Sequence, residues 1–146
     1  MDRGAAVLLT AATGGLIALQ APINSGLGRA VGTFQAACVS FAIGTAALVV
    51  IASLSGGFGS VGEARTIPWY YLLGGLMGAV YVTSVLVTVR TLGAGGLTAA
   101  TITGQLAASV VVDQLGLLGV ARQPITATRV LGLVLLALGT YLVVRE

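Results

Sequence analysis

The sequence predicts an all-α integral membrane protein with five transmembrane helices. The chain has a mean hydropathy of +1.05. Only 8% of its 146 residues are charged, whereas soluble domains carry about 25% charged residues. Its apolar residues form continuous runs, each near the roughly 20 residues that a helix needs to cross a hydrocarbon core. Because these runs do not alternate with polar residues, a transmembrane β-barrel is excluded.

Five apolar runs are long enough to be spans. They cover residues 5–23, 34–54, 68–89, 95–118 and 125–144. The third opens on Trp69, Tyr70 and Tyr71, which suit a membrane interface. Pro124 precedes the fifth run, and proline is favourable at a helix start. The longest connection, residues 55–67, is rich in glycine and predicts a solvent loop, so residues 1–146 form a single transmembrane domain.

The first run has a second interpretation. It follows "MDR" and precedes "ALQA", a pattern that a cleaved secretory signal peptide can also show. We expect it to be retained as a helix, because the run is long for a signal peptide and polar positions follow it at helical spacing.

Several classes of function lack the residues that they need. Cys38 is the single cysteine, and the chain has no histidine, which removes an intramolecular disulfide and the usual zinc and haem sites. An enzyme is not expected, because acid and base partners are too few. The net charge of +3 is scattered rather than clustered, so nucleic-acid binding is not expected either. No metal or cofactor is predicted.

A polar stripe runs along the fourth span. Thr101, Gln105, Ser109 and Asp113 follow one another at intervals of four, which places them on one side of a helix. A carboxylate within a span costs a few kcal/mol unless it is paired or hydrated. The stripe is therefore predicted to face protein or water rather than lipid.

Two roles for Asp113 are open. It could be a coupling or substrate-binding carboxylate that exchanges a proton or another ion for cargo. It could equally form a structural ion pair with Arg122 or Arg129, which lie on the same side of the membrane. Gln105 lies near the midplane, where many transporters bind substrate, so we expect it to line a cavity; a hydrogen bond between helices is its alternative.

Further polar candidates lie in the first three spans. Gln20 and Asn24 are four residues apart with Pro22 between them, and proline can kink a helix. They predict a polar, kinked gate at a cavity mouth, although Asn24 also suits the interfacial end of a helix. Tyr81 could stack on a planar or cationic substrate. Ser40 could line the cavity or bond a neighbouring helix.

Four glycines are candidates for helix packing. Gly74 and Gly78 form a small-xxx-small pattern that lets helices approach closely. Gly132 and Gly139 are seven residues apart and so share a face of the last span. We expect that span to pack or dimerise without lining a cavity.

The arginines barely determine the orientation. The side of the N-terminus carries Arg3, Arg65, Arg122 and Arg129; the other side carries Arg29, Arg90 and Arg145. Because loop arginines set orientation, this balance predicts a chain that inserts both ways. Two such chains would form an antiparallel pair of ten helices, an inverted repeat of the kind common in transporters. The alternative is one orientation with the N-terminus inside.

The chain resembles the short, five-helix YdcZ-like branch of the drug/metabolite transporter superfamily. The similar segments are "ALQAPINSGLGRAVG", "ACVSFAIGTAAL", "WYYLLGGLMGAVYVTS", "TLGAGGLTAATITGQLAASVVVDQLGLLG" and "RVLGLVLLALG". The family often has histidine after the carboxylate, whereas this chain has Gln114. The resemblance implies a multi-pass protein of the bacterial cytoplasmic (inner) membrane that exports a small molecule, either as a dimer or as half of a ten-helix unit.

These observations predict a secondary-active transporter or exporter. We expect an antiparallel homodimer with a polar cavity between the first four spans, driven by protons or another ion because no nucleotide-binding motif is present. Two other functions are open: a small dual-topology ion channel, and a non-transporting subunit that pairs with a different chain such as a paralogue. In each case the lipid bilayer surrounds the chain.

Overall fold

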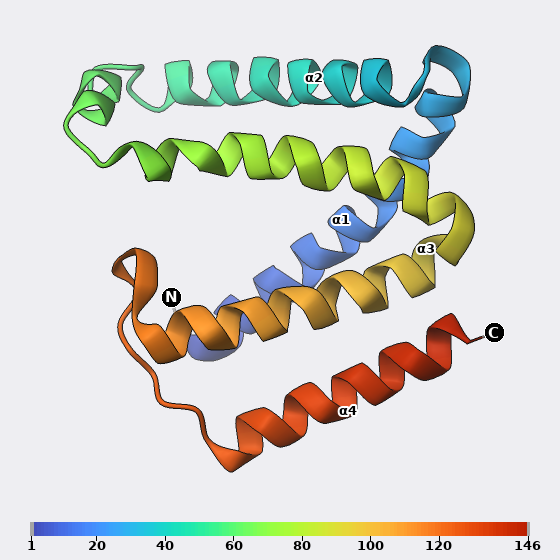
Figure 1. Ribbon diagram of the computed structural model, residues 1–146. Coiled ribbons are helices and arrows are strands. Elements are labelled where there is room, and N and C mark those ends of the chain that lie inside the picture. Colours follow the sequence, from blue (N-terminus) through green and yellow to red (C-terminus); the bar gives the residue numbers. More distant parts are fainter. Residues whose placement is uncertain (1, 146) are drawn as a thin grey trace. The chain divides into compact units, whose positions relative to one another are not determined.

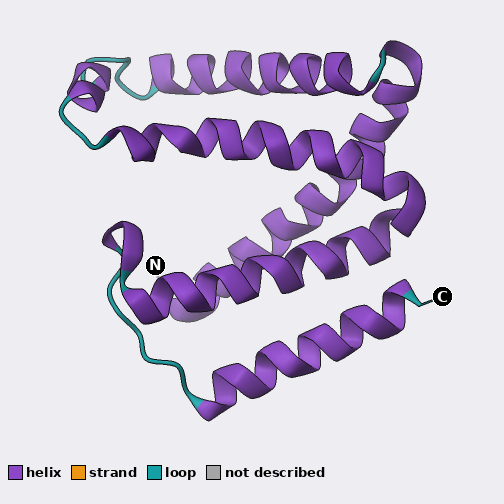
Figure 2. Cartoon of the chain, viewed as in Figure 1, coloured by secondary structure: helices purple, strands orange, loops and turns teal. Residues whose placement is uncertain are grey.

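The computed structural model describes residues 2–145, and the regular secondary structure in that range is helical (Figures 1 and 2). The long helices are α1 (Arg3–Val31), α2 (Thr33–Leu54), α3 (Gly74–Leu115) and α4 (Ala127–Val144), and the short 3₁₀ helices are η1 (Val61–Arg65), η2 (Trp69–Leu73) and η3 (Leu117–Gly119). Four helices are long and apolar enough to cross a membrane. The all-α membrane class is therefore confirmed, whereas the number of such helices is four rather than five.

The first helix is longer than the predicted span. Asp2 caps it by accepting a hydrogen bond from the backbone N–H of Ala5 at 2.8 Å. The helix then continues through Pro22 and ends at Val31 instead of residue 23. Only Gly32 separates it from α2. Gly32 has φ +97° and ψ 153°, a conformation that L side chains avoid, so this glycine lets the chain reverse in one residue.

The third helix contains most of the residues of two predicted spans. α3 has 42 residues, about 63 Å at 1.5 Å per residue, whereas a hydrocarbon core is about 30 Å thick. Gly93 interrupts it with φ 67° and ψ 172°, which no α-helical residue adopts. The predicted start at residue 68 is wrong for the α-helix, because Trp69–Leu73 form the 3₁₀ helix η2.

The other predicted boundaries shift by a few residues. α3 ends at Leu115 rather than residue 118, because Gly116 adopts the left-handed conformation that commonly ends helices. α4 begins at Ala127 rather than residue 125. The hydroxyl of Thr126, and not Pro124, defines that start by accepting from the backbone N–H of Arg129 at 3.3 Å.

The chain divides into two compact units, Met1–Arg90 and Thr91–Glu146. In the first, α2 and the beginning of α3 lie side by side (Figure 1). Their shared core consists of small and branched apolar residues, with Leu27 of α1 and Tyr81 packed against it; its members are Ala36, Ala37, Val82 and Leu86. Leu86 is fully buried. Small alanines on α2 allow the two helix axes to approach closely.

In the second unit, the remainder of α3 lies beside α4. The hydroxyls of Thr103 and Thr140 are 2.6 Å apart, and the Thr140 hydroxyl also donates to the carbonyl of Ala99 at 3.0 Å. Near the other end of this pair, Gly96 lies close to the side chain of Val144. Hydroxyl and glycine contacts of this kind are the usual means by which membrane helices associate.

We predict that Gly32→Ala destabilises the protein by about 1 to 3 kcal/mol, because the positive φ is strained for any L side chain. A Cβ there would also lie 2.5 Å from Oε1 of Gln35. Thermal unfolding in detergent measures the effect. Gly26→Ala is the matched control, since a Cβ at Gly26 has open space. An equal melting temperature for the two variants would contradict this explanation of the α1–α2 turn.

Candidate functional site

Asp113, the acidic end of the predicted stripe, forms an ion pair with Arg129. Nη1 of Arg129 lies 3.3 Å from Oδ2 of Asp113, and the two side chains are 33% and 28% exposed, respectively. Arg129 reaches this position because it lies in the first turn of α4, and its other terminal nitrogen donates to Oε1 of Gln123. Of the two roles open for Asp113, the structure therefore contains the ion pair with Arg129.

The loop between α3 and α4 is tied to the end of α3. The backbone N–H of Gln123 donates to the carbonyl of Asp113 at 2.8 Å. The side-chain oxygen of Gln114 accepts from the backbone N–H of Ile125 at 2.7 Å, and the Gln114 carbonyl accepts from Nε of Arg122 at 2.9 Å. Gln114 therefore holds the loop, a role that an amide oxygen can perform without titrating.

The middle of the stripe points elsewhere. Gln105 and Ser109 are exposed, whereas Thr101 and Asp113 are half-buried. Each step of four residues rotates about 40° around a helix, so the row winds. Gln105 is roughly 160° from Thr103, whose hydroxyl contacts α4, whereas Asp113 is roughly 80° from it. The winding brings Asp113 to α4 and leaves Gln105 on the opposite side of α3.

In the first unit, a cluster of polar side chains lies near the C-terminal end of α1. Asn24 and Ser25 are only 7% and 4% exposed. Nε of Arg90, on α3, donates to the hydroxyl of Ser25 at 3.4 Å. Asn24 therefore lies in the interior of the unit, beside a contact that joins α1 to α3.

The remaining candidates of this unit differ in their surroundings. Gln20 is exposed and lies outside the buried face of α1. Ser40 is half-buried on α2. Tyr81 packs against the apolar core, so its side chain takes part in helix packing.

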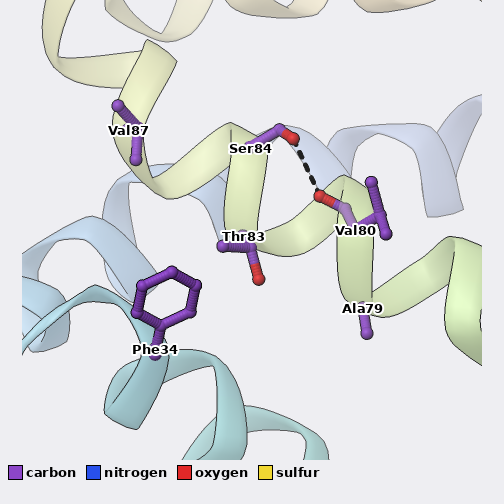
Figure 3. Close-up of a pocket in the computed structure, with 6 residues that line it drawn as sticks. All are labelled: Phe34, Ala79, Val80, Thr83, Ser84 and Val87. Atoms are coloured by element: carbon purple, nitrogen blue, oxygen red, sulfur yellow. Dashed lines mark hydrogen bonds between the residues drawn. The ribbon is translucent and has the colours of Figure 1, made fainter.

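An open groove of about 470 Å³ lies between the start of α2 and the first part of α3. It is lined by Phe34, Ala79, Val80, Thr83, Ser84 and Val87. Figure 3 shows Ala79 and Thr83 on the side of α3 nearest Phe34. The Ser84 hydroxyl donates to the carbonyl of Val80 at 2.8 Å, so it is engaged within its own helix. The groove can bury an apolar group but holds no charge.

The four packing glycines also differ. A Cβ at Gly78 would lie 3.5 Å from the ring of Phe41, so α2 and α3 are close there. A Cβ added at Gly74, Gly132 or Gly139 would meet nothing within 4 Å. These three positions therefore leave room for another helix or for lipid.

Sequence reasoning did not single out Ser25, Arg90, Thr103 or Thr140. Ser25 carried a signal, because Ala21, Asn24, Ser25 and Gly28 recur at helical spacing and form the buried face of α1. The Thr103–Thr140 pair joins residues 37 positions apart, and no local pattern links them. Nothing in the sequence distinguishes Arg90 from the other arginines.

The structure has the features of a multi-pass membrane protein. Its helices are long and apolar, many of its aliphatic side chains are exposed, and polar contacts join its helices. The profile of the family described as "Putative inner membrane exporter, YdcZ" matches residues 5–142, and the chain belongs to this family. The YdcZ resemblance is thus confirmed, and with it the location in the inner membrane and the general class of exporter. No curated protein and no solved structure matches the chain.

We predict that the Asp113–Arg129 pair contributes about 1 kcal/mol or less, since both side chains are partly exposed. A double-mutant cycle with Asp113→Asn and Arg129→Gln, followed by thermal unfolding in detergent, measures this coupling. The matched cycle pairs Asp113→Asn with Arg122→Gln, because Arg122 bonds the Gln114 carbonyl and not Asp113. We expect coupling near zero in that second cycle, and equal coupling in both cycles would contradict a specific pair.

Proposed function

We propose that the protein is a secondary-active exporter of small molecules that works as an antiparallel homodimer with a polar cavity. The observation that carries this proposal is the exposure of Gln105 and Ser109 on a largely apolar helix. Burying an amide in an apolar medium without a hydrogen-bond partner costs roughly 2 to 7 kcal/mol. A second chain or a water-filled cavity removes that cost, and a cavity between chains provides both.

Five spans per chain fit this proposal better than four. A single straight span cannot use the 42 residues of α3, because about 20 residues already cross the hydrocarbon core. The irregular backbone at Gly93 supports two spans with a reversal between them. With five spans the N- and C-termini of one chain lie on opposite sides of the membrane.

The balance of arginines supports the antiparallel arrangement. With five spans, four arginines lie on one side and three on the other. This difference is too small to favour one orientation of insertion. The two chains would then supply the two inverted repeats that longer transporters encode in one chain.

Asp113 is the candidate for ion coupling. Among residues 2–145 it is the only acidic residue in the four long helices. Binding a proton or another cation to this carboxylate weakens its attraction to Arg129. The released Arg129 would loosen its contact with Gln123 and the loop before α4, which links ion binding to movement of helix ends. The chemistry is transport rather than catalysis, since one carboxylate without histidine gives no acid–base pair.

We predict that a cysteine in the 55–67 loop is labelled from both sides of the membrane. The variant is Ser60→Cys in a Cys38→Ser background, because Cys38 is the single native cysteine and Ser60 is exposed. With balanced insertion, about half of the molecules should react with an impermeant maleimide in intact cells, and all of them after permeabilisation. Arginines added at Gly59 and Gly62 should shift this ratio strongly. Labelling from one side only would refute dual insertion.

We predict that Asp113→Asn abolishes gradient-driven transport without loss of folding. Charge movement after a concentration jump across proteoliposomes, screened over cations, anions and neutral metabolites, provides the measurement. Gln105→Ala should weaken the response to the active compound without altering its dependence on the gradient. Ser53→Ala is the control, because that hydroxyl bonds within its own helix. Full gradient-driven transport by Asp113→Asn would exclude the coupling role.

A further inference from the structure

Arg90 and the buried face of α1 form a cluster of polar side chains that has no role in the proposed export cycle. Ala21, Asn24, Ser25 and Gly28 are the buried residues of α1. Arg90 lies three residues before Gly93, near the interruption of α3. Its Nε donates to the Ser25 hydroxyl at 3.4 Å in a partly buried setting. The guanidinium therefore lies against the polar end of α1.

Gly28 makes room for this guanidinium. A Cβ on Gly28 would lie 3.2 Å from Nη2 of Arg90 and 3.4 Å from Cδ2 of Leu86. The first distance is tighter than ordinary van der Waals contact, so with alanine at position 28 the exposed arginine head group would have to shift by a few tenths of an ångström. Gly26 is only two positions away, and a Cβ there meets nothing within 4 Å. The close approach is thus specific to the buried side of the helix.

No carboxylate of this unit neutralises Arg90. The unit contains only two acidic residues, Asp2 and Glu63. Asp2 caps the start of α1 and Glu63 lies in η1. Over residues 2–145 the structure has one ion pair, and it joins Asp113 to Arg129.

The donors around Arg90 suit an oxyanion. Arginine presents five N–H groups in a planar fork, and the bond to Ser25 uses the one on Nε. Four N–H groups on the two terminal nitrogens are left, in the geometry that matches carboxylate and phosphate oxygens. Asn24 adds a buried amide next to Ser25. Arg29, four residues after Ser25 on α1, is an exposed cation one turn further along the helix.

We propose that Arg90, Ser25 and Asn24 form a binding site for an oxyanion, a carboxylate or a phosphate. The inference rests on the proposed function and names the substrate class of the exporter as small organic anions. The phosphate of an anionic lipid has the same chemistry, so the experiment separates a free anion from a lipid head group.

The test measures anion binding without transport. Purified full-length protein in neutral detergent is titrated with inorganic phosphate and with acetate, against chloride at equal ionic strength, and the melting temperature is followed. A second series uses nanodiscs of phosphatidylcholine with and without phosphatidylglycerol. We expect saturable stabilisation of the wild type by at least one oxyanion source and none by chloride.

The variants locate the site. Arg90→Lys keeps the charge but loses the planar fork, so binding should weaken about tenfold, as for the loss of one or two charge-assisted hydrogen bonds. Gly28→Ala, which changes no charge, should also weaken binding through displacement of the guanidinium. Gly26→Ala and Arg65→Gln should bind as the wild type does.

The outcomes separate the site from the proposed function. Stabilisation by phosphate or acetate that Arg90→Lys and Gly28→Ala weaken supports the site, even if no transport occurs in proteoliposomes. Stabilisation only by phosphatidylglycerol, with the same dependence on the variants, supports the oxyanion site but assigns it to a lipid. If no oxyanion stabilises the folded wild type, or if Arg90→Lys and Arg65→Gln bind as tightly as the wild type, the site is refuted while export can still stand.

Discussion

The hydrocarbon region of a lipid bilayer contains no hydrogen-bonding solvent, and this governs where every polar side chain of the protein is placed. A polar group in the hydrocarbon region must find its partner within protein or water. The hydroxyls of Thr10 and Ser53 satisfy this by donating to carbonyls one turn earlier in their own helices. Thr103 and Thr140 satisfy it between helices. Asp113 satisfies it with Arg129 at the end of α3. Gln105 and Ser109 are exposed, and an exposed amide and hydroxyl on a membrane helix favour a partner chain or a cavity beside them.

The same constraint explains why glycine and alanine occupy the closest helix contacts. Apolar side chains gain little by leaving lipid for another helix, so association depends on close packing. Ala36 and Ala37 lie in the core of the first unit, and Gly78 admits the ring of Phe41. Gly28 admits the guanidinium of Arg90. Small residues therefore serve two purposes in this unit: they let helices touch, and they let one cation lie against the backbone of α1.

Much of the fold could be predicted from the sequence, because span length and hydropathy depend on the bilayer and not on tertiary contacts. The α2 boundaries were within one residue of the prediction. The continuation of α1 from residue 24 to Val31 was missed, because its glycines and polar residues are poor helix formers alone and are retained by packing of Asn24, Ser25 and Gly28 in the interior. Of the candidate site, Asp113 and its possible arginine partners were identified in advance. The contact of Arg90 with Ser25 was not, since it joins positions 65 residues apart.

Composition and hydropathy are enough to assign this protein to a lipid bilayer, to predict its helical class and its possible spans, and to identify the few polar residues that need partners. Hydrophobicity and helical spacing are local properties, so they can be read directly from the amino-acid sequence. The partner of each polar group depends instead on how the helices pack. A row of residues four apart winds around its helix, and this winding brings Asp113 to Arg129 while it turns Gln105 away from α4. The choice between such partners depends on how neighbouring helices approach, and that approach is set by contacts between distant residues.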